Sequence, residues 1–320
     1  MALFIALALS TLAAVVPTIV YTLTFYWADR YEREPRSLLL AAFIWGAIPA
    51  VIASLIGEVA LGAPLVTDPL SLEAALVEGA IIAPIVEEVF KALALWWLFT
   101  WMRHEFDGVL DGLVYGALIG FGFAMTENFF YFIGAFDEGG FVNLTAVIIL
   151  RSVVFGLNHA FYTSLTGIGF GLARGARRPL IRFMWIAAGL SAAILVHSLH
   201  NLGSTLASIT LAGFVLSLAI AVGGLCLLVI TVLLAWSHER AIIRTELSDE
   251  VDRTLSAQEL ALLTGHWRQP LRRRAGKQAG RMALLVELAI RKRALRHARE
   301  KRSAELHEEI AQIRSQLAQA

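Results

Sequence analysis

The sequence predicts an all-α, polytopic membrane helix bundle of about seven transmembrane helices, followed by a cytoplasmic helical tail. Hydrophobic residues make up 58% of the chain and charged residues only 17%, whereas soluble domains carry about 25% charged residues. Charge is also unevenly divided. Residues 1–236 hold 10 Lys and Arg against 15 Asp and Glu, and residues 237–320 hold 17 against 11. We therefore predict a membrane-embedded, protease-like domain at 1–236 and a basic, largely helical tail at 237–320.

Seven stretches are long enough to cross a bilayer, which takes about 20 mostly apolar residues. The first stretch has no charge between Met1 and Trp27, which favours a retained helix over a cleaved signal peptide. The seven predicted spans are residues 2–28, 37–63, 73–101, 108–135, 144–173, 183–203 and 207–236.

The connecting segments alternate in basic charge. Segments 29–36, 102–107 and 174–182 contain three, one and four Arg, and the three intervening segments contain none. Loops rich in Lys and Arg stay in the cytoplasm. The pattern therefore predicts a multi-pass protein of the cell membrane with its N-terminus outside and its tail in the cytoplasm.

The third span contains three ionisable residues, Glu87, Glu88 and Lys91. Charged groups inside a span are rare, face the bundle interior and usually serve a function. Each glutamate is one helical turn from Lys91, but adjacent side chains point about 100° apart. We expect one carboxylate to pair with Lys91 and the other to stay free as a candidate general base. A purely structural ion pair, or an ion-coupling site, explains the same spacing.

The fourth span carries a glycine stripe, Gly112, Gly116 and Gly120, ahead of Glu127. Such a stripe lets a neighbouring helix approach closely. Plain packing accounts for the glycines. Their further use would be to bring Glu127 near the third span.

The fifth and sixth spans add Arg151, His159, His197, His200 and Asn201. We expect Arg151 to pair with a glutamate such as Glu78. A lone buried histidine is usually a hydrogen-bonded core residue, but His197 and Asn201 share a helix face. Together they have the chemistry to donate hydrogen bonds to a developing oxyanion. A polar helix end near the outer surface is the alternative.

Taken together, these residues resemble the motifs of the PrsW family of intramembrane proteases, which is similar to the CAAX prenyl protease and bacteriocin-processing group. The resemblance covers about residues 20–205. It is carried by four motifs: Glu87-Glu88-x-x-Lys91, Phe123-x-x-x-Glu127-Asn128, His159 and His197-x-x-x-Asn201.

The resemblance implies an intramembrane endopeptidase that hydrolyses membrane-anchored proteins, as in anti-sigma-factor cleavage during bacterial stress signalling. It makes Glu87 the base that activates water, with Glu88 as the alternative, and Lys91 the partner of the other carboxylate. His197 and Asn201 would form the oxyanion site. The related group has histidine where this chain has Glu127, so His159 is the expected helper for the water.

Family members are described both as metalloproteases and as metal-independent glutamate proteases. There is no HExxH motif, and we favour a reaction that requires no cofactor. A divalent metal such as zinc, if present, would be held by four residues whose oxygen and imidazole donors suit it: Glu88, Glu127, His159 and His197.

The tail is predicted to be helical. Ser256 and Glu259 fit a capping box, with Gly265 as a stop. The basic residues Arg272, Arg273, Arg274, Lys277 and Arg281 would contact anionic lipid headgroups. The amphipathic stretch from Met282 onward suits a helical hairpin or a helical partner, and a solvated regulatory tail is the alternative. No fold motif supports binding of nucleic acid.

Two other functions compete with proteolysis. A proton- or ion-coupled transporter would use the buried Glu and His residues, although it would be expected to show internal repeats, and none is evident. A non-catalytic scaffold would act through its tail. The partners common to these hypotheses are the bilayer and a membrane protein.

Overall fold

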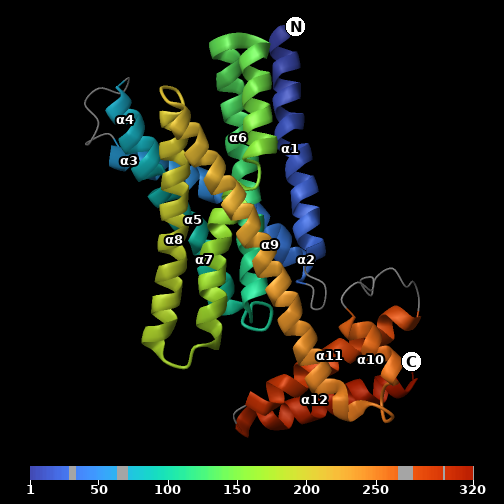
Figure 1. The fold of residues 1–320 in the computed structure, drawn as a ribbon. Helices are drawn as coiled ribbons and strands as arrows, with labels where there is room; N and C mark the ends of the chain where they lie inside the picture. The colour runs from blue at the N-terminus through green and yellow to red at the C-terminus, as the bar shows by residue number, and fades with distance from the viewer. Residues whose placement is uncertain (29–33, 63–70, 266–276, 298–299, 320) are drawn as a thin grey trace. The chain divides into compact units, whose positions relative to one another are not determined.

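Every regular element in the described part of the chain is a helix (Figure 1). This computed structural model describes residues 1–28, 34–62, 71–265, 277–297 and 300–319. Its first helices are α1 (Ala2–Ala28), α2 (Arg36–Trp45), α3 (Val51–Gly62), α4 (Leu72–Val77), α5 (Ala83–Trp101), α6 (Val109–Ile148), α7 (Asn158–Gly175) and α8 (Pro179–Leu206). The later ones are α9 (Leu211–Leu247), α10 (Ala257–Thr264), α11 (Lys277–His297) and α12 (Glu300–Gln319).

Four short turns of other helix types join these elements. Three are π-helical, with hydrogen bonds that skip one residue more than in an α-helix. They are η1 (Gly46–Ala50), η2 (Glu78–Ile82) and η3 (Ile149–Val154), and η4 (Ser248–Glu250) is a 3₁₀ turn.

Within the part of the chain that the structure describes, five helical stretches are long and apolar enough to cross a membrane. In lipid a spanning segment must satisfy its own backbone hydrogen bonds, so an apolar run of this length is stable only as a helix. The five stretches are Ala2–Ala28, Arg36–Gly62, Val109–Gly175, Pro179–Leu206 and Leu211–Glu250. The all-α membrane bundle predicted from the sequence is thereby confirmed.

The count of seven spans stays a prediction. Apart from residue 108, predicted spans 108–135 and 144–173 both lie within the single stretch Val109–Gly175, and predicted span 73–101 is not among the five. That span is helical from Leu72 to Trp101. Its apolar run is interrupted by the ionisable residues Glu87, Glu88 and Lys91.

Helix α6 contains the turn that separates two of the predicted spans. Gly139 and Gly140 depart from helical geometry, and Gly140 has φ +63°. A residue with a Cβ adopts this backbone conformation with difficulty, so glycine is suited to it. Beyond the turn, Leu144 packs with Phe132 and with Ala6 of α1 in one buried cluster.

The glycine stripe of α6 packs against α7 and not against the third predicted span. A Cβ on Gly112 would lie 2.1 Å from the carbonyl oxygen of Gly167, and one on Gly120 would lie 2.3 Å from that of His159. The two backbones are therefore as close as glycine permits. The stripe therefore does not itself contact the third span, and it positions His159, which lies between Glu127 and Lys91 of that span.

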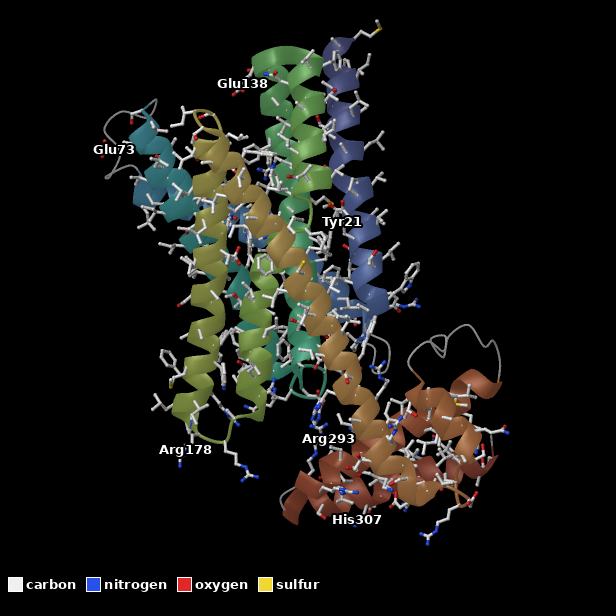
Figure 2. All side chains as sticks on the ribbon, viewed as in Figure 1. Tyr21, Glu73, Glu138, Arg178, Arg293 and His307 are labelled. Carbon is white, nitrogen blue, oxygen red and sulfur yellow. The ribbon has the colours of Figure 1, made fainter. Side chains whose placement is uncertain are left out.

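The described part of the chain divides into two compact units, one within residues 1–230 and the other within residues 231–319. In the first unit, large apolar side chains such as Leu12, Val153 and Leu195 are more than half exposed, as expected for a surface that faces lipid. Figure 2 shows Glu73 and Glu138 toward one end of this unit and Arg178 at the opposite end.

The second unit has a core of its own. Leu288 of α11 and Ile310, Ile313 and Leu317 of α12 are buried together, so the amphipathic stretch forms the helical hairpin that its pattern predicts. The capping box of α10 is present, with Ser256 and Glu259 bonded reciprocally and Gly265 at the C-cap.

The predicted lipid-binding stretch lies largely outside the described residues. Arg272, Arg273 and Arg274 are not described, and of Lys277 only the backbone is. Arg281 is described, and it donates hydrogen bonds to Glu259 and to the carbonyl oxygens of Leu317 and Thr254. Its guanidinium therefore holds the tail helices together.

Candidate functional site

The site begins with the buried ion cluster on α5. Lys91 Nζ lies 2.9 Å from Glu87 Oε2 and 2.9 Å from Glu88 Oε1, and the lysine side chain is fully buried. The ammonium also lies 3.7 Å from the ring centroid of Phe123. The expectation that only one glutamate would reach Lys91 is wrong, because spacings of three and four residues place the lysine between the two carboxylates.

The two glutamates are held differently. Glu88 is fully buried, and it accepts hydrogen bonds from Lys91, from Thr163 Oγ1 at 3.1 Å and from His197 Nδ1 at 3.2 Å. Glu87 is 5% exposed. Among the described residues, Lys91 bonds its Oε2, and Oε1 makes no hydrogen bond. Glu88 is therefore fixed from three sides, and Glu87 keeps an oxygen for another partner.

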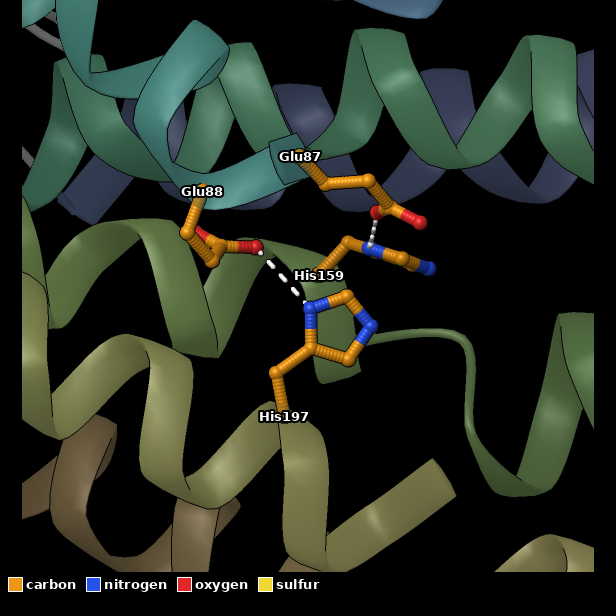
Figure 3. A group of neighbouring side chains, drawn as sticks. All are labelled: Glu87, Glu88, His159 and His197. Carbon is orange, nitrogen blue, oxygen red and sulfur yellow. Dashed lines mark hydrogen bonds and ion pairs between the residues drawn. The ribbon is translucent and has the colours of Figure 1, made fainter. Parts of the chain in front are cut away.

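His159 of α7 and His197 of α8 complete this group (Figure 3). His159 Nδ1 lies 3.2 Å from Lys91 Nζ and 4.0 Å from Glu87 Oε2. The ring of His197 stacks on that of Tyr162 at a centroid distance of 4.6 Å. Glu87, Glu88, Lys91 and His197 together are called the deep cluster below.

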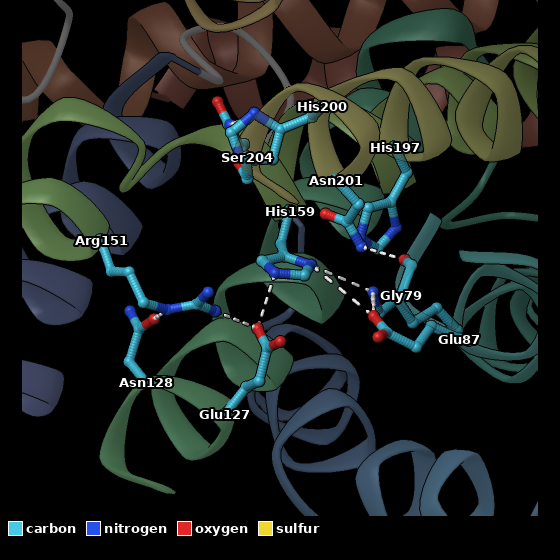
Figure 4. A network of polar contacts seen from close by, with 12 residues as sticks. Gly79, Glu87, Glu127, Asn128, Arg151, His159, His197, His200, Asn201 and Ser204 are labelled. Carbon is cyan, nitrogen blue, oxygen red and sulfur yellow. Dashed lines mark hydrogen bonds and ion pairs between the residues drawn. The ribbon is translucent and has the colours of Figure 1, made fainter. Parts of the chain in front are cut away.

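A second polar group lies on the other side of His159 (Figure 4). His159 Nε2 is 2.8 Å from Glu127 Oε2, which also accepts a hydrogen bond of 2.6 Å from Arg151. Arg151 Nε donates to Asn128 Oδ1 at 2.7 Å. The prediction that Arg151 pairs with Glu78 is therefore wrong. Glu127, Asn128 and Arg151 are called the outer cluster below, and His159 joins the two clusters.

Asn201 is oriented by a backbone carbonyl that has no partner within its own helix. In the π-helical turn η2 the N–H of Ala83 bonds the carbonyl of Glu78, five residues back. The same pattern would pair Gly79 with Pro84, which has no N–H. The carbonyl of Gly79 instead accepts a hydrogen bond of 2.8 Å from Asn201 Nδ2. This bond orients the amide and leaves its second N–H available.

A cavity of about 370 Å³ opens beside His159. Its walls include residues of both the outer cluster and α8, among them Glu127, Arg151 and Asn201. Glu87, Glu88 and Lys91 do not line it. A substrate in the cavity would therefore meet His159 first, with the deep cluster behind that ring.

All seven residues predicted for the site are brought together. Five belong to the deep cluster and His159, and Glu127 and Asn201 line the cavity. Sequence reasoning missed Thr163, Asn158 and Tyr162. Thr163 is four residues after His159, on the same helix face, so the polar stretch around that histidine carried a signal for it.

The metal question depends on Lys91. The donor atoms of Glu87, Glu88, His159 and His197 lie within 4.8 Å of one another, and oxygen and imidazole donors suit zinc. This group contains Glu87 where the sequence pointed to Glu127. Glu127 contacts Nε2 of His159, whereas the other ring nitrogen, Nδ1, faces Lys91 among the residues of this group.

The arrangement as folded nevertheless does not fit a metal. Three of the four donor residues surround Lys91 Nζ at 2.9–3.2 Å. Zinc bonds such donors at about 2.0–2.2 Å, so a metal among them would overlap the ammonium. Residues with metal-binding chemistry are therefore present, but the ammonium of Lys91 occupies the space between them.

Comparisons with known proteins agree with the motifs. The family described as "PrsW family intramembrane metalloprotease" matches residues 34–236. "Protease PrsW" of Geobacillus kaustophilus is 28% identical over 173 residues, which is 54% of this chain and 70% of that protein. The protein of that name in Halalkalibacterium halodurans is 25% identical, covering 59% of this chain and 80% of the relative.

"Protease PrsW" of Bacillus subtilis is 27% identical over 194 residues, which is 59% of this chain and 79% of the relative. No solved structure matches. These matches give no support to a transporter. The apolar helices, the buried Glu and His residues and the family match all agree, and the chain belongs to the PrsW family of intramembrane proteases, which makes it a membrane-embedded peptidase.

Proposed function

We propose that Glu87 is the general base that activates water for hydrolysis of a peptide bond in a membrane-anchored protein. The observation that carries this assignment is the contrast between the two glutamates. Glu88 is saturated by Lys91, Thr163 and His197, whereas Glu87 has an unbonded oxygen. Removal from water strengthens a carboxylate as a base, and such a base contributes about 10²–10⁴-fold to a rate.

The water would sit between Glu87 and His159. Glu87 Oε2 and His159 Nδ1 are 4.0 Å apart and both contact Lys91 Nζ, so the water would bind the other carboxylate oxygen, Oε1, beside the His159 ring. Glu87 takes a proton as the water oxygen bonds to the peptide carbon. The tetrahedral intermediate then collapses, the C–N bond breaks, and the proton passes to the amine that leaves.

Asn201 is assigned to stabilise the oxyanion, because its amide lines the cavity and has one N–H free. His197 was expected to share this role. A carboxylate only accepts hydrogen bonds, so His197 Nδ1 carries the proton that faces Glu88. A neutral His197 has no second N–H, and we assign it to anchoring Glu88.

The reaction is proposed to need no metal, since Lys91 occupies the centre of the donor group. The substrate class is a membrane-anchored regulatory protein of the anti-sigma-factor kind, with its scissile segment in the cavity. We retain the predicted orientation, N-terminus outside and tail in the cytoplasm. Arg178, in the loop with four Arg, lies at the end of the first unit opposite Glu73 and Glu138 (Figure 2), which supports this orientation.

The test is cleavage of a membrane-anchored model substrate by detergent-purified protein. Glu87→Gln is expected to lower kcat by about 10²–10⁴-fold. Glu73→Gln, at an exposed residue of α4, is the matched control and is expected to cleave normally. EDTA is expected to leave the wild-type rate unchanged. A fully active Glu87→Gln protein would remove Glu87 as the base, and loss of activity in EDTA would contradict the metal-free reaction.

A further inference from the structure

The two ring nitrogens of His159 face partners of opposite kinds. Lys91 Nζ, 3.2 Å from Nδ1, has only N–H groups to donate. The Glu127 carboxylate, 2.8 Å from Nε2, can only accept. Both neighbours therefore select the same tautomer, with the proton on Nε2 and the lone pair on Nδ1 directed at the deep cluster. This is the tautomer that can receive a hydrogen bond beside Glu87.

Glu127 is itself held in place by Arg151. The guanidinium donates one hydrogen bond of 2.6 Å to Glu127 Oε2 and another of 2.7 Å to Asn128 Oδ1. Its flat face lies 3.8 Å from the ring centroid of Tyr131. Two hydrogen bonds and one stacked face fix the orientation of a planar group, and a lysine would not be fixed in this way.

The backbone explains why Arg151 reaches this place. Arg151 belongs to the π-helical turn η3, which ends where Phe155 N–H bonds the carbonyl of Leu150. The helix stops there, and α7 starts at Asn158, so His159 begins a new helix only eight residues after Arg151. Both side chains line the same cavity. The π-helical turn therefore places the arginine where its guanidinium and His159 Nε2 share one oxygen, Oε2, of Glu127.

We propose that Arg151 is a positioning residue for the peptidase reaction: through Glu127 it fixes the ring orientation and tautomer of His159. The proposal rests on the function proposed above, in which His159 orients the water beside Glu87. Arg151 itself need not touch the substrate. Its loss frees Glu127 to rotate, and His159 then samples both tautomers.

The direct test is the protonation pattern of the ring. Protein labelled with ¹⁵N-histidine is compared with Arg151→Gln and with Glu127→Gln, and the His159 signals are assigned with His159→Gln. Wild-type protein is expected to show one tautomer, protonated on Nε2. Both variants are expected to show averaged nitrogen signals. Unchanged His159 signals in Arg151→Gln would overturn the proposal.

Kinetics supply the second test. Arg151→Gln is expected to lower kcat by about 10–100-fold with KM changed less than about twofold, since misplacement of a catalytic group acts on the chemical step. Arg151→Lys keeps the positive charge but not the paired hydrogen bonds to Glu127 and Asn128, and it is expected to recover part of the lost kcat. The double variant Glu127→Gln/Arg151→Gln should be no slower than Glu127→Gln alone, because the two residues act in series.

Controls separate this proposal from a general loss of folding and from a failure of the proposed function. Arg178→Gln, at an exposed residue, should match the wild type in every assay. If Arg151→Gln fails to fold, Arg151→Lys carries the NMR and kinetic tests. Additive losses in the double variant would overturn the proposal. A fully active Glu87→Gln protein would remove the proposed base and leave the tautomer result standing.

Discussion

The deep and outer clusters share His159 but are built on different principles. The deep cluster places two carboxylates around one ammonium, and side-chain exposure of Glu87, Glu88 and Lys91 is 7%, 0% and 0%. The outer cluster pairs one carboxylate with one guanidinium, at side-chain exposures of 20% and 24%. The deep cluster is closed to solvent and has more carboxylates than fixed cations. The outer cluster is partly exposed, and its one carboxylate is matched by one cation.

The difference suggests a division of labour. In a low-dielectric site an uncompensated charge is costly, so the second carboxylate of the deep cluster needs another cation, a proton or a polar partner. That requirement suits a group that takes up a proton during a reaction. The outer cluster has no such demand, because Glu127 and Arg151 satisfy each other, and this suits a group that holds geometry.

The largest effect is expected from removing the cation of the deep cluster. Lys91→Met leaves two buried carboxylates unpaired, and breaking a buried ion pair destabilises a protein by about 3–5 kcal/mol. We expect no detectable cleavage and a lower thermal unfolding midpoint in detergent. The substitution also frees the donors that surround Nζ, so the variant is expected to bind zinc and to regain part of its thermal stability when zinc is added.

Zinc content of dialysed protein is the measurement that decides this case. Lys91→Met with one zinc per chain, against wild type with almost none, would confirm that ammonium and metal are alternative occupants. Equal zinc content in both proteins would contradict it. His104→Gln, at an exposed residue outside the site, controls for zinc bound elsewhere by histidine.

A smaller loss is expected when His159 is displaced while both clusters keep their charges. Gly120→Ala places a Cβ 2.3 Å from the carbonyl oxygen of His159, so α6 and α7 must separate. A displacement of about 1 Å can cost about 10²-fold in rate. Gly134→Ala lies on the same helix, where a Cβ meets nothing within 4 Å, and should keep wild-type kcat. Similar kcat values in the two variants would show that tight α6–α7 packing does not position the site.

The smallest effect on catalysis is expected from an ion pair outside the membrane-spanning segments. Arg281→Gln removes hydrogen bonds to Glu259, Leu317 and Thr254, which we expect to destabilise the tail helices by about 1–3 kcal/mol. Hydrogen exchange of α10 to α12 should become faster, whereas kcat should change less than about twofold. A large loss of kcat would show that the tail contributes to the reaction.

The same pair has a defined pH dependence. Partial burial raises the pKa of Glu259, but the hydrogen bonds from Arg281 and Ser256 and the charge of Arg281 together outweigh burial and hold this pKa below its usual value. A lowered pKa in the folded state adds stability above the ordinary pKa, and that stability is lost as pH falls through the lowered value. The exchange difference between wild type and Arg281→Gln should therefore narrow below about pH 4.

The sequence was most informative where neighbours along one helix make the contacts. Glu87 and Glu88 lie four and three residues before Lys91, so an ion pair with the lysine could be predicted, although its sharing by both carboxylates was not. The capping box of Ser256 and Glu259 depends on a spacing of three. Apolar length likewise predicted helices, because lipid leaves the backbone no other partner. Helical geometry decides which of these residues can meet, and that much the sequence alone determines.

Contacts between helices were decided by the tertiary structure. The same local rules did not predict that Arg151 would pair with Glu127, that the glycine stripe would face α7, or that Asn201 would bond Gly79. Each depends on which helix faces turn toward each other and on interruptions such as η2, η3 and the turn at Gly140. The sequence thus determined which groups are buried in the bundle, and only packing decided which of them meet, because residues far apart in the chain have no fixed spacing.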